Sequence, residues 1–171
     1  GLTSVTIGSG VKSIGLIAFA GDANILHMTC NAVVPPRVYF ESAFDNVFHG
    51  IPLYVPMGSL SSYQVAYAWR DFTNIIGTYS ITARSIDPTM GTVVGGGSYA
   101  NGATATLTAM PNAGYCFVRW QDGITDNKRT VSVTGDSTFT AYFETAYSIT
   151  TTSNDPTMGT VTGGGSYANG A

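Results

Sequence analysis

The sequence predicts a mainly β protein in three consecutive parts: the end of a short solenoid with a small capping helix, a small antiparallel β module, and a truncated second copy of that module. Three observations predict this fold class. Apolar positions recur at an offset of 23 in the first half, apolar residues alternate with Thr in the second half, and the segment 80–103 returns at 148–171 with 20 of 24 residues identical. The expected domains are residues 1–77, 78–147 and 148–171.

Composition narrows the classes of function. Charged residues make up only 10% of the chain, against about 25% in ordinary domains, and 19 of the 23 Thr follow Gly77. The net charge of -3 leaves no basic stripe for nucleic acid. No apolar run approaches the roughly 20 residues of a membrane-spanning helix. We expect neither a nucleic-acid partner nor a membrane span, and we expect both ends of the chain to be fragment boundaries.

The pattern of residues 1–77 predicts stacked coils. The pattern "LTSVTI" from Leu2 returns as "ILHMTC" from Ile25, and "AF" at 18–19 returns at 43–44. Each coil is expected to contain a short strand, a turn and a short buried return. Alternation in "ILHMTC" places Cys30 on the face of Leu26 and Met28, which predicts a buried free thiol rather than a disulfide with Cys116.

A cap is expected at the end of the stack, because the last coil of a solenoid has a bare apolar face. Ser59 is expected to cap a short helix with Leu60, Tyr63 and Tyr67 on one side. Trp69 and Phe72 are then expected to plug the core, a structural role that we prefer to ligand binding.

The residues 1–77 resemble the BspA-like leucine-rich repeats of bacterial surface proteins, which are common in Bacteroidetes. They share the sequence pattern L-x-x-V-x-I followed by I-G-x-x-A-F. Pro35, Pro36 and "LYVP" at 53–56 also look like the terminal unit of that family. This resemblance implies a leucine-rich solenoid whose concave strand face recognises a partner.

The second part has the signals of short β-strands. "ATATLTA" from Ala103 places Ala105, Leu107 and Ala109 on one face, and "STFTAYF" does the same with Phe139, Ala141 and Phe143. The Asn101-Gly102 pair predicts a type I′ hairpin turn, in which both residues have positive φ. Rings in "GYCFVRW", above all Trp120, are expected to supply much of the core.

The residues 78–147 also resemble the divergent repeats related to the internalin B-repeat. The marks are "GTVxGGGxYxxGxxxTLTAxPxxGYxFxxWxDG" from Gly91 to Gly123 and a closing "TxTAxF" from Thr138 to Phe143. This resemblance implies a small β-grasp-like or sandwich-like extracellular spacer, often found after leucine-rich repeats.

No catalytic or metal site is expected. His27 is predicted to be a solvent-facing strand residue, and His49 lies in a loop without a partnering carboxylate. The stretch "QDGITDN" at 121–127 lacks the oxygen set of a calcium loop and reads as a hairpin turn.

No cofactor is expected either. "GGGSYA" formally satisfies the dinucleotide fingerprint at Gly95, Gly97 and Ala100, but a turn and a strand follow it rather than a helix. We therefore interpret these glycines as a bend where backbones approach closely.

The first functional hypothesis is a non-enzymatic secreted or cell-surface protein, in which the solenoid binds an extracellular protein or glycan and the β modules act as a spacer. Two alternatives remain open. The parts are accessory modules of a secreted peptidase or glycan hydrolase, or the β modules themselves bind carbohydrate through Tyr99 and Tyr142. No individual ligand-binding residue is assigned, and an export signal is expected upstream of Gly1.

Overall fold

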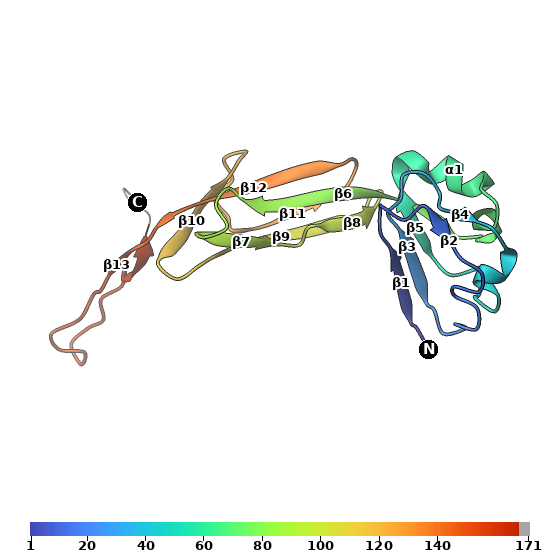
Figure 1. The fold of residues 1–171 in the computed structure, drawn as a ribbon. Coiled ribbons are helices and arrows are strands. Elements are labelled where there is room, and N and C mark those ends of the chain that lie inside the picture. The colour runs from blue at the N-terminus through green and yellow to red at the C-terminus, as the bar shows by residue number, and fades with distance from the viewer. Residues whose placement is uncertain (168–171) are drawn as a thin grey trace. The chain divides into compact units, whose positions relative to one another are not determined.

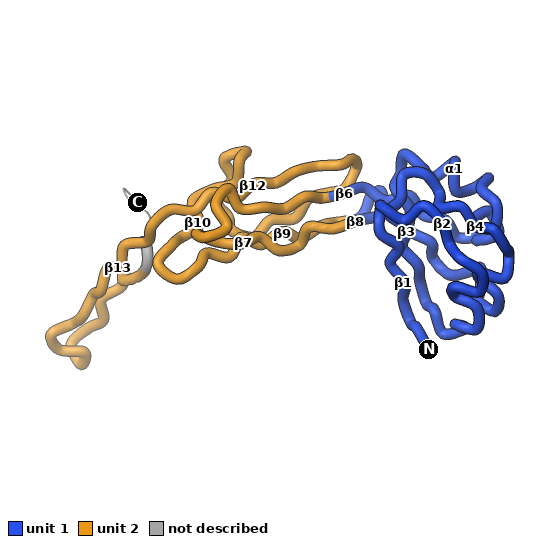
Figure 2. The backbone as a smooth tube through the Cα atoms, viewed as in Figure 1, with its two compact units in different colours: residues 1–80, 98–103 blue, residues 81–97, 104–171 orange. Residues whose placement is uncertain are grey.

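The computed structural model describes residues 1–167 and divides the chain into two compact units (Figure 2). Unit 1 comprises residues 1–80 and 98–103, and unit 2 comprises residues 81–97 and 104–171. The segment 98–103 therefore belongs to unit 1, although the residues on both sides of it in the sequence belong to unit 2.

Unit 1 is a stack of parallel strands (Figure 1). In spatial order they are β1 (Ser4–Ile7), β3 (His27–Cys30), β5 (Leu53–Pro56) and the first half of β6 (Ile75–Ser85). A second, shorter parallel pair joins β2 (Ser13–Ile14) to β4 (Arg37–Val38). Val5 pairs with Met28 and Ile7 with Cys30, so the 23-residue offset of the sequence is the register of the sheet.

The core of unit 1 lies behind these strands. Met28, Cys30, Leu53 and Val55 are fully buried, as alternation along β3 and β5 requires. The predicted buried, unpaired state of Cys30 is confirmed. Leu26, which alternation placed on the same face, is instead 68% exposed because it precedes the strand.

Short helices cover the end of the core. They are η1 (Glu41–Phe44), η2 (Met57–Ser59), α1 (Leu60–Val65) and η3 (Trp69–Asp71). Tyr63, Trp69 and Phe72 are at most 2% exposed, and the Trp69 ring meets those of Phe44 and Tyr63 edge to face at 5.2 and 5.3 Å. The predicted aromatic plug is confirmed.

Two details of the predicted cap are wrong. Ser59 occupies the N-cap position of α1, but its side chain makes no capping hydrogen bond and is buried. The helix ends at Val65 because Ala66 is extended. Tyr67 therefore leaves the helical face of Leu60 and Tyr63 and is 45% exposed.

The first copy of the module, in unit 2, contains two small sheets. One joins the second half of β6 to β12 (Ser137–Thr145) and β10 (Tyr115–Trp120), and the other has the order β11 (Lys128–Ser132), β9 (Thr104–Pro111), β7 (Gly91–Val94). Strand β8 (Gly97–Ala100) pairs with β6. The expectation of an all-antiparallel module is wrong, since β12 runs parallel to β6, from Ser137 beside Ile81 to Ala141 beside Ser85. Alternating burial fixes the face of a strand but not its direction, and β6 and β12 are the first and last strands of these two sheets.

The core of unit 2 follows the predicted alternation. Ala105, Leu107 and Ala109 are at most 1% exposed, and Trp120 is fully buried. The Trp120 Nε1–H donates to the carbonyl oxygen of Asp126 at 2.9 Å. Gly91 on β7 lies against the Phe143 ring on β12, only 2.7 Å from where a Cβ would stand. The two sheets therefore pack directly on each other at this point.

The turn at Asn101-Gly102 differs from its prediction. Gly102 has a φ of 80°, but Asn101 is not among the residues with positive φ, so the turn is not of type I′. It does not close a hairpin, since β8 pairs with β6 whereas β9 pairs with β7 and β11. The turn carries the chain from one sheet to the other.

The second copy of the repeat forms a small strand pair of its own, β13 (Tyr147–Ile149) with β14 (Gly165–Tyr167). Its turn repeats that of the first copy: Thr157 donates from its backbone N–H to the Asp155 carboxylate at 2.9 Å, as Thr89 does to Asp87. The burial differs, because Ile149 is 52% exposed whereas the equivalent Ile81 is 2% exposed. The last residues of the copy, 168–171, lie outside the described part.

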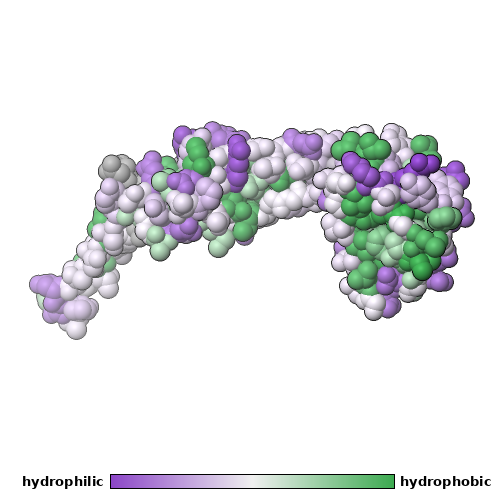
Figure 3. Space-filling model, in the orientation of Figure 1, coloured by the Kyte–Doolittle hydropathy of each residue, from purple (hydrophilic) through white to green (hydrophobic). Residues whose placement is uncertain are grey.

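The surfaces of the two units differ in kind. Figure 3 shows apolar residues gathered over unit 1, whereas the visible face of unit 2 is mostly pale, as Thr-, Ser- and Gly-rich strands require. Within residues 1–167, no helix has the length and apolar character needed to cross a bilayer.

Candidate functional site

A cavity of about 320 Å³, which we call the strand-face cavity, lies on the solvent side of the parallel strands of unit 1. Its lining comes from four strands: His27, Thr29, Tyr54, Thr78, Ser98, Tyr99 and Ala100. Alternation explains the contribution of β3 and β5, because the residues between these side chains, Met28 and Leu53 among them, point into the core. All the lining residues belong to unit 1.

The register of the sheet brings the aromatic and hydroxyl groups together. Thr29 pairs with Tyr54 across β3 and β5, and the rings of His27 and Tyr54 meet edge to face at 6.3 Å. The Thr78 hydroxyl donates to the carbonyl oxygen of Val55 at 3.1 Å, which holds β6 against β5. The β8 segment supplies Ser98 and Tyr99 to the same cavity.

This lining is suited to binding an uncharged polar ligand. It combines two tyrosines, one histidine and three Ser or Thr hydroxyls with no Asp, Glu, Lys or Arg. Tyrosine presents an apolar ring with a polar tip, and hydroxyls both donate and accept hydrogen bonds. The prediction that His27 faces solvent is confirmed by its exposure on β3.

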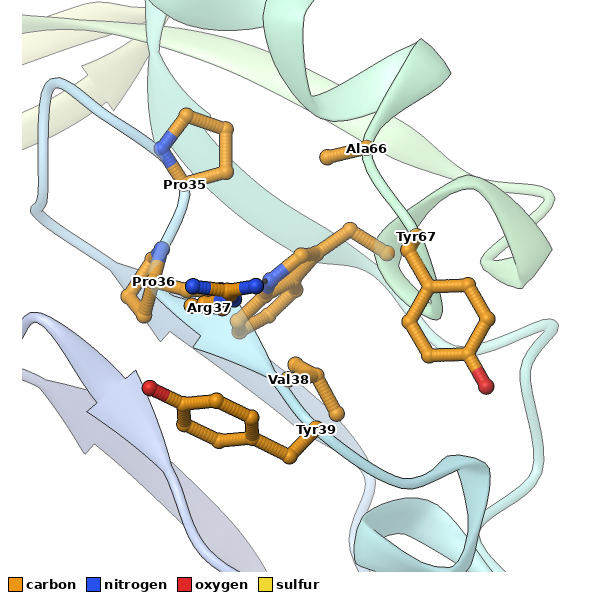
Figure 4. A pocket seen from close by; sticks show the side chains of 8 residues that line it. Pro35, Pro36, Arg37, Val38, Tyr39, Ala66 and Tyr67 are labelled. Carbon is orange, nitrogen blue, oxygen red and sulfur yellow. Dashed lines mark hydrogen bonds between the residues drawn. The ribbon is translucent and has the colours of Figure 1, made fainter.

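A second cavity of unit 1, of about 410 Å³, lies beside the cap. Figure 4 shows Pro36, Arg37 and Tyr39 at one side of this cavity and Tyr67 at the other. The Arg37 guanidinium carbon stands 4.9 Å from the centre of the Tyr39 ring. Partial burial, together with the charge of Glu41 and a hydrogen bond to it, raises the pKa of the Tyr67 phenol.

The back wall of this second cavity is structural. Trp69 is fully buried, and its Nε1–H donates to the carbonyl oxygen of Pro36 at 2.7 Å. This bond fixes the Pro35-Pro36 segment on the cap. The residues that form this wall thus stabilise the fold of unit 1. We therefore rank the second cavity below the first as a recognition site.

The two tyrosines considered for carbohydrate binding separate in the structure. Tyr99 lies in the strand-face cavity of unit 1. Tyr142 lies in unit 2, where the Arg119 guanidinium carbon stands 4.4 Å from its ring centre. Sequence reasoning missed Tyr54, although its position between the buried Leu53 and Val55 in "LYVP" would have marked it as outward-facing.

The segments considered for cofactor and calcium chemistry have other local structures. Gly97–Ala100 form strand β8, so no helix begins at "GGGSYA". Gly95 and Gly96 instead lie against neighbouring backbone, as the interpretation of a close approach predicted. In "QDGITDN", the Asp122 carboxylate is paired with Arg129 at 2.8 Å, and this partner contributes to lowering the pKa of Asp122 against the opposing effect of burial.

One comparison with known proteins found a match, and it covers part of the second half of the chain. No match was found among curated proteins or among solved structures. A family model described as the divergent InlB B-repeat domain matches residues 81–146. The matched range does not reach residues 1–80, so the leucine-rich-repeat resemblance of the first part stays a prediction. Residues 81–146 are thus similar to the divergent InlB B-repeat domain.

Proposed function

We propose that this chain is part of a non-enzymatic secreted or cell-surface protein, in which unit 1 binds an extracellular protein or glycan. The observation that carries the proposal is the strand-face cavity, where Tyr54, His27 and Tyr99 meet a set of hydroxyl groups. Stacked repeats expose broad strand faces of this kind and use them for recognition. The parallel stack with its 23-residue register supports the leucine-rich-repeat assignment of residues 1–77.

In this proposal the B-repeat domain serves as a spacer. The match over residues 81–146 supports this role, since such domains are typical of surface proteins. The near-identical copy from Ser148 supports a tandem array, in which further modules extend the distance between the binding unit and its attachment.

Binding is tested with the 171-residue chain on a printed panel of glycans and purified extracellular matrix proteins. A bound ligand is then measured against Tyr54→Ala and His27→Ala, with Tyr67→Ala as the matched control, because Tyr67 is an exposed tyrosine of the same unit outside this cavity. We expect Tyr54→Ala to weaken binding about tenfold or more, the usual effect of losing a central aromatic contact, and Tyr67→Ala to have no effect. Equal binding by the Tyr54→Ala and Tyr67→Ala variants would refute the assignment of the ligand to this cavity.

The location is tested separately. Fractionation of the source cells with an antibody against unit 2 is expected to place the intact protein in the medium or on the cell surface. Recovery in the cytoplasm alone would contradict the proposal of extracellular recognition, whatever the binding assays show.

A further inference from the structure

The two copies of the repeat differ at only four positions. Residues 83, 84, 86 and 94 are Ala, Arg, Ile and Val in the first copy, and Thr, Thr, Asn and Thr in the second. None of the four is buried in the first copy, whereas the buried Ile81 and Gly91 are retained in the second as Ile149 and Gly159. The differences therefore fall at positions that are not buried in the first copy.

Two of the four differences fall in one cavity of unit 2. Arg84 and Ile86 line a cavity of about 390 Å³, together with Ser85, Gln121, Thr140 and Tyr142. The equivalent residues of the second copy, Thr152 and Asn154, have neither the positive charge nor the apolar side chain. A ligand that is bound through the side chains of Arg84 and Ile86 would therefore not be bound in the same way by the second copy.

Arg84 lines this cavity, whereas Arg119 is not among the lining residues and adjoins them through the ring of Tyr142. Arg84 on β6 pairs with Thr140 on β12, and its Nε–H donates to the Thr140 hydroxyl at 3.3 Å. Arg119 on β10 pairs with Tyr142 and stands over its ring. Thr140 and Tyr142 are two residues apart on one strand, so their side chains share a face, and the two arginines that contact them lie on that face too.

The charges of these arginines are not compensated within the site. Over residues 1–167, ion pairs are seen at Arg70 and Arg129, and none at Arg84 or Arg119. Arg129 illustrates the contrast, because its side chain is 12% exposed and bonded to Asp122. Glu144 lies on the same face as Tyr142, beyond it along β12 and opposite Cys116, so it marks the negative end of this surface.

We propose that this cavity binds a saccharide that carries a carboxylate group. The carboxylate is held by the Arg84 and Arg119 guanidiniums, whose planar donors match its geometry. The sugar ring rests against Ile86 and Tyr142. An acidic peptide fits less well, because extended peptides add to a free sheet edge, whereas this cavity lies over β12, which has β6 and β10 on its two sides.

The test uses the 171-residue chain and two acidic probes with neutral counterparts: sialyllactose against lactose, and a hyaluronan tetrasaccharide against a neutral tetrasaccharide. Affinity is measured by isothermal titration calorimetry. We expect at least one acidic probe to bind about tenfold or more tighter than its counterpart, which is the effect of a hydrogen-bonded charge pair. Sialic acid and uronic acid are distinguished by which of the two probes binds.

Variants taken from the second copy locate the site without threatening the fold. Arg84→Thr combined with Ile86→Asn introduces the residues that the second copy has at these two positions and is expected to abolish the preference for the acidic probe. Ala83→Thr combined with Val94→Thr introduces the other two differences and is expected to retain it. Arg119→Gln is expected to weaken acidic binding while leaving the neutral probe unaffected.

Three outcomes would overturn the proposal. These are equal affinity for acidic and neutral probes, unchanged acidic binding by the Arg84→Thr/Ile86→Asn variant, and equally tight binding of a hexaglutamate peptide. The strand-face cavity of unit 1 is tested independently, since a ligand lost on Tyr54→Ala but retained by Arg84→Thr/Ile86→Asn belongs there.

Discussion

Gly95 lies against Thr106 so closely that a Cβ on Gly95 would overlap the carbonyl oxygen of Thr106. The φ of Gly95 is 96°, a region that other residues rarely adopt. The duplicate Gly163 has nearly the same φ, 97°, but no atom of residues 1–167 lies within 4 Å of its Cβ position. The two glycines thus share one backbone conformation and differ in packing.

Gly95→Ala is expected to destabilise unit 2 by about 3 kcal/mol or more, because backbone strain and a steric overlap add. Gly163→Ala is the matched control and is expected to leave the unfolding of unit 2 unchanged, since its strain is confined to the β13–β14 pair. Urea unfolding followed by circular dichroism measures both variants. Equal losses would show that backbone conformation alone matters at Gly95.

Trp120 is expected to be the most sensitive position of the unit 2 core. Trp120→Ala removes a fully buried ring and should cost about 3 to 5 kcal/mol. Trp120→Phe keeps an aromatic ring but leaves the Asp126 carbonyl oxygen without its indole donor, for which we expect a smaller loss of about 1 to 3 kcal/mol. Val94→Thr, a change already present in the second copy, is the control. A loss for Trp120→Ala no larger than that for the control would contradict the burial.

The sequence predicted those features that depend on alternation within a strand. The offset between "LTSVTI" and "ILHMTC" gave the register of β1 and β3, because a slip of one residue would turn Met28 and Cys30 out of the core. The same reasoning correctly predicted the buried face of β9. Each of these features follows from neighbours along the chain.

Features that depend on pairing between distant segments were not predictable in this way. The parallel pairing of β6 with β12 brings together residues 81 and 137, and no local pattern records strand direction. The strand-face cavity needs Ser98–Ala100 beside β6, a placement that depends on the bend at Gly95 and Gly96. The face of unit 2 that carries Arg84 and Arg119 likewise depends on the strand order β6, β12, β10.

The stability of unit 1 is expected to fall at high pH. Burial raises the pKa of the Cys30 thiol above its ordinary value of 9.0, and burial and the nearby Cys30 raise the pKa of Tyr63. At about pH 7 and below, both groups are protonated in the folded and unfolded states. Above it, only the unfolded chain ionises readily, so the free energy of unfolding decreases as pH rises.

Urea unfolding of Cys30→Ala and Cys116→Ala between about pH 7 and 10.5 tests this linkage. Cys116 lies in unit 2 and is the matched control. We expect a shallower pH slope for unit 1 in Cys30→Ala and an unchanged slope in Cys116→Ala. Tyr63→Phe should also flatten the slope, although it costs stability at every pH because the hydroxyl donates to Ala32 at 2.8 Å. Identical slopes in the two cysteine variants would exclude Cys30 as a source.

Backbone amides of the second copy are expected to exchange with solvent much faster than those of the first. The two copies of the repeat have nearly the same sequence, and both contain the turn in which a Thr backbone N–H donates to an Asp carboxylate. Local structure therefore does not distinguish them. The packing does, because Ile81 is covered and pairs with Ser137 on β12, whereas Ile149 is half exposed. Protection against exchange follows burial and cooperative pairing. Hydrogen exchange read at Ile81 and Ile149 by NMR compares the two copies directly. Protection of residues 148–167 equal to that of residues 103–143 would mean that the second copy is anchored by contacts beyond those of its own strand pair.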